Sequence, residues 1–122
     1  MPAVEVLYFQ EGEEEVPLIL WLDQLPAKAQ QKCQVRLERL EAQGNDLRRP
    51  EADYLRDDIY ELRASCLGVH YRMLYFFHGR AAVVVSHGIV KEQRVPPREI
   101  ALAMKRRQTF ESCPEKHAFK KR

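Results

Sequence analysis

The fold is decided by one stretch, residues 59–87, which reads IYELRASCLGVHYRMLYFFHGRAAVVVSH. Three runs rich in β-branched and aromatic residues follow one another in it, at 59–65, 70–77 and 81–87. Gly68 and residues 78–80 (HGR) separate these runs, and short gaps that contain glycine are typical of hairpin connections. The stretch therefore predicts three antiparallel strands in a meander.

The residues before this stretch predict one strand and two helices. Residues 4–9 are β-branched and aromatic, which favours a strand. Acidic residues then precede Pro17 and an apolar run, which is typical of a helix start, and this helix is expected to end near Leu25. Residues 27–43 repeat apolar side chains at helical spacing up to Gly44, so they predict a second, amphipathic helix.

A polar loop is expected at residues 46–57, and one more helix is expected after the meander. Pro96 and Pro97 open this helix, which runs to about Gln108. Residues 112–122 are basic and show no apolar pattern, so they predict a flexible tail. The folded domain is therefore expected to cover residues 1–111.

The predicted order of elements is β-α-α-β-β-β-α, which defines an α+β fold. The simplest packing is a small twisted, mainly antiparallel sheet with a helical hairpin on one face and a helix near the C-terminus. Tyr71, Met73, Tyr75 and Phe77 alternate on one face, so we expect core residues there rather than a base-stacking platform. The other sheet face is expected to be open and polar, and functional residues should lie on it.

Length and composition exclude several classes of protein. A chain of 122 residues with 45% hydrophobic and 31% charged residues predicts one globular domain rather than a disordered chain. No stretch approaches the roughly 18 apolar residues of a membrane span, and residues 1–10 lack a signal-peptide pattern. Three cysteines are too few for a secreted disulfide scaffold. We therefore expect a cytoplasmic protein that makes no membrane contact.

Charge is divided unevenly along the chain. Residues 1–58 carry 13 acidic and 7 basic side chains, whereas residues 59–122 carry 5 acidic and 13 basic ones. A basic half suits a polyanion, and its binding would be sensitive to salt. A solvated basic tail explains part of this asymmetry. The basic residues that bear on binding of a polyanion are therefore Arg63, Arg72 and Lys91, which lie in predicted structured segments.

Two arginines are expected to meet on the open face. Arg63 shares its strand face with Glu61, and a regular hairpin places Arg72 beside it, with Cβ atoms about 5 Å apart. Like charges this close require either a carboxylate between them, with Glu61 the candidate, or a bound anion. His87 could titrate near neutrality, and Lys91 adds a cation near the same edge.

Four motifs and one lysine in this region are recognisable together: YELR at 60–63, YRMLYFFHG at 71–79, VVVSHG at 83–88, PPREI at 96–100, and Lys91. They resemble the phage-derived, HigB-like branch of the RelE/ParE toxin superfamily. The resemblance covers roughly residues 3–108, and the predicted order of elements agrees with the RelE fold.

The resemblance implies a toxin of a type II toxin–antitoxin pair that cleaves messenger RNA, usually on the ribosome, without a metal or other cofactor. The implied reaction is attack of a ribose 2′-hydroxyl on the adjacent phosphate. Such a reaction needs a proton acceptor, cations around the phosphate and a proton donor for the leaving oxygen. The implied partners are messenger RNA, the ribosome and a small cognate antitoxin, usually of the helix-turn-helix type.

The resemblance also implies roles for particular residues. Arg63 and Arg72 would clamp the scissile phosphate, since a guanidinium binds phosphate oxygens bidentately. His87 or Glu61 would accept the 2′ proton, because the tyrosine that well-known relatives carry near the last helix is missing at residues 95–98 (VPPR). The expected catalytic residues are Arg63, Arg72, His87 and Lys91, and the further expected RNA contacts are Glu61, His70, Arg94 and Arg98.

Two other functions stay open. A ParE-like toxin would inhibit DNA gyrase without nuclease chemistry, and a degenerate toxin would only bind its antitoxin. The basic set on the open face favours the nuclease. A zinc site formed by Cys66, His70, Cys113 and His117 is not expected, because these residues lack the tight double-cysteine spacing of zinc fingers.

Overall fold

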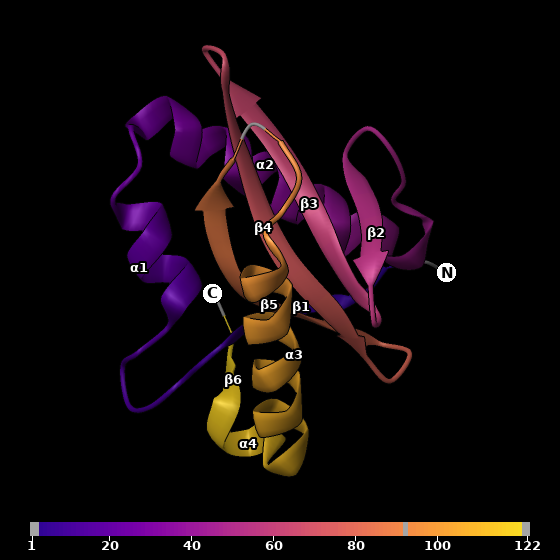
Figure 1. Ribbon diagram of the computed structural model, residues 1–122. Coiled ribbons are helices and arrows are strands. Elements are labelled where there is room, and N and C mark those ends of the chain that lie inside the picture. The colour runs from indigo at the N-terminus through magenta and orange to yellow at the C-terminus, as the bar shows by residue number, and fades with distance from the viewer. Residues whose placement is uncertain (1–2, 92, 121–122) are drawn as a thin grey trace.

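The computed structural model describes residues 3–91 and 93–120, which form an α+β fold built on one sheet (Figure 1). Its elements are β1 (Glu5–Phe9), α1 (Pro17–Asp23), α2 (Ala27–Gln43), a 3₁₀ turn (Gly44–Asp46), β2 (Ala52–Arg56), β3 (Ile59–Cys66), β4 (Val69–His78), β5 (Ala82–Val90), α3 (Pro97–Ser112), α4 (Pro114–His117) and β6 (Ala118–Phe119). Within the described residues the strand order is β2-β3-β4-β5-β1-β6. Because β1 and β5 pair in parallel and the other neighbours antiparallel, the predicted mainly antiparallel sheet is confirmed.

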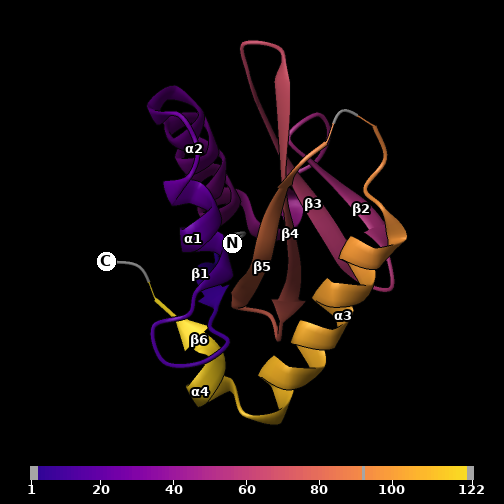
Figure 2. The same cartoon turned by 60° about the vertical axis from the view of Figure 1, so that its left-hand side comes forward.

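The helical hairpin of α1 and α2 covers one face of the sheet, as predicted (Figure 2). Leu18 of α1 and Leu40 of α2 are fully buried against Tyr71, Met73 and Tyr75 of β4, in one continuous core. The predicted alternation of β4 on this face is therefore confirmed.

The opposite face is not open along its whole length, which corrects the expectation of a helix-free polar face. Helix α3 packs across it, and its Phe110 joins Leu74 and Phe76 of β4 in a second core (Figure 2). The five consecutive apolar residues at 73–77 explain this packing, since a strand that is buried on both faces has no polar face to present. Figure 1 looks onto this face and shows that α3 covers one half of the strands.

A strand lies where the sequence predicted only a loop. Strand β2 occupies residues 52–56 and pairs antiparallel with β3 as the edge strand of the sheet. Its sequence, ADYLR, is short and largely polar, so it lacks the apolar run by which strands are recognised. The predicted loop at 46–57 is therefore wrong over five residues that adjoin the two arginines.

Short elements occupy those residues of the predicted flexible tail that the structure describes. Helix α3 continues to Ser112, and the following residues form α4 and β6, which pairs with β1. The ring of Phe119 stacks on that of Tyr8, and the ring of His117 stacks on that of Phe9, with centroids 6.2 and 5.5 Å apart. Residues 121 and 122 of the predicted tail lie outside the described residues.

Candidate functional site

Arg63 and Arg72 lie directly opposite each other on β3 and β4, and Glu61 bridges them. The Oε2 of Glu61 accepts a hydrogen bond from Nε of Arg63 at 2.9 Å and forms an ion pair with its Nη2 at 2.8 Å, and its Oε1 accepts a hydrogen bond from Nη1 of Arg72 at 3.0 Å. Glu61 is buried, with 2% of its surface exposed. Of the two arrangements that the sequence left open, the structure contains the one with the carboxylate.

The edge strand β2 adds a second carboxylate to this cluster. Asp53 lies opposite Glu61 in the β2–β3 pairing, and its Oδ2 accepts hydrogen bonds from Arg63 at 3.2 Å and from Arg49 at 2.9 Å. Asp53 keeps 22% of its side chain exposed, in contrast to the 2% of Glu61. The cluster is therefore a chain of alternating charges from Arg49 to Arg72, and Asp53 is its more accessible acid.

The cluster forms one wall of a cleft of about 810 Å³ at the half of the sheet that α3 leaves uncovered. The residues from 93 to 97 and the start of α3 form the opposite wall. Five arginines and two acids are among the residues that line this cleft: Arg49, Arg56, Arg63, Arg72, Arg94, Asp53 and Glu61. The cleft therefore carries a net positive formal charge, and such a charge favours a polyanionic ligand.

The cleft contains four of the eight residues predicted from the sequence. Arg63, Arg72, Glu61 and Arg94 line it. His70 and Lys91 are exposed farther along β4 and after β5, where the amide of Lys91 donates to the carbonyl oxygen of His70 at 3.0 Å. Arg98 points outward, with 80% of its side chain exposed and its Nε 3.7 Å from Glu99.

His87 is buried under the start of α3 and does not line the cleft. Its Nδ1 lies 2.7 Å from the hydroxyl of Ser86, and its Nε2 lies 3.0 Å from a carboxylate oxygen of Glu99. Burial lowers the pKa of His87 and outweighs the opposing effect of the Glu99 hydrogen bond. The lowered pKa favours the neutral form of His87, which links β5 to α3 through Glu99.

Sequence reasoning missed Asp53, Arg49, Arg56 and Glu99. The first three belong to β2 and its approach, a segment predicted to be a loop. The alternation of basic and acidic residues in this segment could have indicated that it belongs to the site. Arg49 and Asp53, for example, are four residues apart and form an ion pair. Glu99 could be found only by placing α3 on the sheet.

The comparison with protein families adds an independent finding. The family model described as "Phage derived protein Gp49-like" matches residues 20–108. The chain belongs to this Gp49-like family. The match extends from α1 into α3, so it includes every element that contributes to the cleft. A search of the curated proteins found no match.

Two further properties of the Gp49-like chain concern membranes and metals. Across residues 3–91 and 93–120, no helix has both the length and the apolar character that a membrane crossing requires. In the same residues no group of three or more His, Cys, Asp or Glu side chains is arranged to hold a metal ion. His117 instead contacts the carbonyl oxygen of Gln10 through Nδ1, at 2.8 Å.

Proposed function

We propose that this Gp49-like protein is a toxin of the RelE/HigB type that cleaves messenger RNA on the ribosome and is neutralised by a cognate antitoxin. The observation that carries the proposal is the pair of opposed guanidiniums of Arg63 and Arg72, held by Glu61 in the wall of an arginine-lined cleft. Membership of a phage-derived family and the motif resemblance at residues 60–100 support it.

Glu61 serves the proposed site by fixing the two guanidiniums. Both of its oxygens accept from arginine, and its burial leaves it little freedom to move. Arg72 gives Glu61 one hydrogen bond through Nη1, and a guanidinium has five N–H donors, so donors remain for a phosphate. An ion-paired arginine held in advance binds a phosphate at low entropic cost.

The proposed reaction is an internal phosphoryl transfer in the RNA. The 2′-oxygen forms a bond to the adjacent phosphorus, and the bond from phosphorus to the 5′-oxygen breaks. The guanidiniums of Arg63 and Arg72 stabilise the charge that develops on the phosphorus oxygens. The products are a 2′,3′-cyclic phosphate and a free 5′-hydroxyl, whose proton comes from water in the open cleft.

Asp53 is the proposed acceptor of the 2′ proton, in place of His87 or Glu61. It is the more exposed of the two cleft carboxylates, and its Oδ1 accepts only the amide of Tyr54, at 3.0 Å, among the described contacts. His87 is buried away from the cleft. A base must lie within hydrogen-bond reach of the proton it accepts, and Asp53 adjoins the guanidinium of Arg63.

The proposed antitoxin is a small helix-turn-helix protein, as the resemblance implies. It would neutralise the toxin by covering the arginine-lined cleft or by blocking entry to the ribosome. If the antitoxin covers the cleft, it should compete with RNA for binding to the Gp49-like chain. If it blocks entry to the ribosome, the chain should bind the antitoxin and RNA at the same time.

A second candidate function is favoured by one observation. His87 and Lys91, two of the four expected catalytic residues, do not line the cleft. An incomplete catalytic set would agree with a ParE-like toxin that inhibits DNA gyrase by binding alone. A supercoiling assay with purified gyrase separates the two functions, because the RNA-cleaving toxin is expected to leave supercoiling unchanged.

The test of the proposed function is Arg72→Ala, assayed by mapping 5′ ends in a translation reaction and by growth after induction. We expect cleavage to fall at least about 100-fold, as for the loss of one charge-stabilising donor, and growth inhibition to disappear. The matched control is Arg80→Ala, in the turn at the other end of β4.

Arg72→Ala leaves Glu61 with one partner, so its fold must be checked by circular dichroism and thermal unfolding. If Arg72→Ala does not fold, Arg72→Lys is the variant that tests the proposed function. Lysine keeps the positive charge opposite Glu61 but lacks the planar guanidinium fork that binds phosphate. Undiminished cleavage or toxicity in the folded variant would overturn the nuclease proposal.

A further inference from the structure

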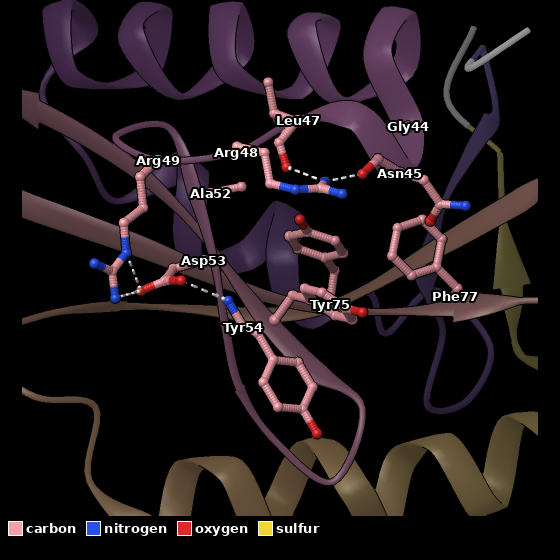
Figure 3. Close-up of a pocket in the computed structure, with 11 residues that line it drawn as sticks. Gly44, Asn45, Leu47, Arg48, Arg49, Ala52, Asp53, Tyr54, Tyr75 and Phe77 are labelled. Atoms are coloured by element: carbon pink, nitrogen blue, oxygen red, sulfur yellow. Dashed lines mark hydrogen bonds and ion pairs between the residues drawn. The ribbon is translucent and has the colours of Figure 1, made fainter.

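A second hollow, of about 650 Å³, lies on the other side of β2 from the arginine-lined cleft (Figure 3). Helix α2 ends at Gln43, and the chain then turns away through Gly44, so the sheet beneath is left without a helix. The floor and sides of the hollow are aromatic: Tyr54 of β2, Tyr60 of β3, and Tyr75 and Phe77 of β4. We refer to it as the aromatic pocket.

The four rings form one connected cluster. Tyr60 stacks on Tyr75 with ring centroids 5.4 Å apart and meets the edges of Tyr54 and Phe77, at 5.2 Å in both cases. Tyr75 is 1% exposed, whereas Tyr54 is half exposed. Offset and edge-to-face contacts hold aromatic rings firmly, so the cluster is a prearranged surface for another flat ring.

The rim of the aromatic pocket is polar and carries two cations. Figure 3 shows Arg48 and Asn45 on one side, Tyr54 on the opposite side, and the ion pair of Arg49 and Asp53 beside them. The guanidinium of Arg48 donates to the carbonyl oxygens of Asn45 and Leu47, so it is fixed at the rim. A planar ligand that belongs to a polyanion would meet favourable charge at this rim.

The aromatic pocket adjoins the arginine-lined cleft at the edge of the sheet. Arg49, Asp53 and Tyr54 line both hollows, and they lie on or beside β2, the edge strand. Because β2 is the edge strand, the two hollows meet where the sheet ends. A chain that is bound by a phosphate in the cleft needs only to pass around this edge to place its next ring in the pocket.

We propose that the aromatic pocket binds a nucleobase of the same RNA strand, one or two nucleotides from the phosphate that Arg63 and Arg72 hold. This inference rests on the proposed function, because it takes the cleft ligand to be RNA. A base is favoured over a hydrophobic side chain of a protein because the rim is cationic and shares Arg49 with the proposed phosphate-binding cleft. Aromatic platforms beside basic grooves bind single-stranded RNA by stacking.

The test compares two oligonucleotides with the same phosphates. One is a 2′-O-methyl RNA hexamer, in which the 2′ attack is blocked, and the other is its abasic counterpart. Fluorescence anisotropy with the full chain is expected to show about 10-fold tighter binding of the hexamer that carries bases, the gain typical of one stacked base.

Two variants locate this preference. Phe77→Leu, at a residue that lines the aromatic pocket but not the cleft, is expected to remove the preference for bases and to leave the affinity for the abasic hexamer unchanged. Tyr54→Ala is expected to remove the preference for bases as well. Leu67→Ala, at an exposed position in the β3–β4 turn, is the control and should change neither affinity. Tyr54→Phe keeps the ring and should bind as the wild type does.

The outcomes separate this inference from the proposed function. Equal binding of the two hexamers, or an equal loss for both in Phe77→Leu, overturns the base pocket even if RNA is cleaved. A preference for bases that depends on Tyr54, without any RNA cleavage, upholds the pocket and overturns the nuclease. Unchanged RNA binding in Tyr54→Ala together with weaker antitoxin binding would make the pocket a protein-binding site and overturn the inference.

Discussion

At the scale of single residues, the arrangement of the cleft depends on Glu61. Two guanidiniums directly opposite each other would repel, and the buried carboxylate converts this repulsion into two short ion pairs. A buried ion pair often contributes little to stability compared with an apolar pair, although breaking it costs about 3–5 kcal/mol. The burial of Glu61 between the two arginines is therefore better explained by the geometry that it imposes on Arg63 and Arg72 than by a gain in stability.

Asp53→Asn tests the proposed proton acceptor. The amide keeps the size of the side chain but is a poor base, so cleavage is expected to fall about 100-fold or more. RNA binding should stay the same or become tighter, because one negative charge leaves the cleft. Single-turnover cleavage and binding of a 2′-O-methyl oligonucleotide measure the two effects separately, and undiminished cleavage would exclude Asp53 as the base.

The lowered pKa of His87 predicts that the folded protein loses stability in mild acid. Its pKa is lowered in the folded protein, so below the unfolded value of about 6.5 the unfolded chain takes up a proton that the folded chain does not. This contribution to stability is present above pH 6.5 and is lost as the pH falls from there toward the folded pKa.

Urea unfolding at pH 7.5 and 5.5 measures this effect. Between the two pH values, the free energy of unfolding of the wild type should fall by up to about 1.4 kcal/mol more than that of His87→Gln. This is the limit for a group that stays neutral in the folded protein. His70→Gln, which changes an exposed histidine, should behave as wild type. An equal pH dependence in wild type and His87→Gln would contradict the assignment.

At the scale of elements, β3, β4 and α2 could be predicted because each is long and periodic. The pairing of Arg63 with Arg72 followed from the short β3–β4 turn. The position of His87 could not be predicted, because the β4–β5 register shifts between Leu74 and Tyr75. This bulge leaves Ser86 without a partner in the pairing and turns His87 onto the α3 side.

Elements with few residues were beyond the reach of sequence patterns. β2 is a polar edge strand, and β6 has two residues, so neither has a hydrophobic period. β2 and β6 are strands because they pair with β3 and β1, and not because their own sequences favour a strand. Asp53 was missed as a site residue for this reason alone.

The C-terminal elements are expected to stabilise the fold. A chain that stops after Ser112 loses α4 and β6 and uncovers Tyr8 and Phe9, which are 3% and 1% exposed in the full chain. We expect its free energy of unfolding to fall by about 2–4 kcal/mol, in line with the burial of two aromatic side chains.

Urea unfolding of this truncated chain should be compared with that of a chain that stops after Phe119. Among the contacts of the described residues, the second chain loses the exposed ion pair between Lys120 and Glu5, which contributes little to stability, and it should unfold as the full chain does. A flexible tail would make both truncations harmless, and that result would contradict the role of β6.

At the scale of the whole molecule, basic side chains from both halves of the sequence gather in one cleft. Its five arginines and two acids give a formal charge of +3. If about three phosphates are neutralised there, the logarithm of RNA affinity should fall with the logarithm of salt concentration with a slope of about −2. Anisotropy titrations from 50 to 400 mM KCl (about three times physiological at the upper end) measure this slope, and a slope near zero would contradict phosphate binding.

The place of β1 between β5 and β6 has a consequence for synthesis of the protein. Strand β1 finds its parallel neighbour only after Val90 has been made, and its other neighbour only after Phe119 has been made. The cleft likewise needs residues from Arg49 to Ile100. A nascent chain therefore cannot form the cleft until Ile100 has left the ribosome, so any function of the cleft must begin after β2, β3, β4, β5 and the start of α3 have been made.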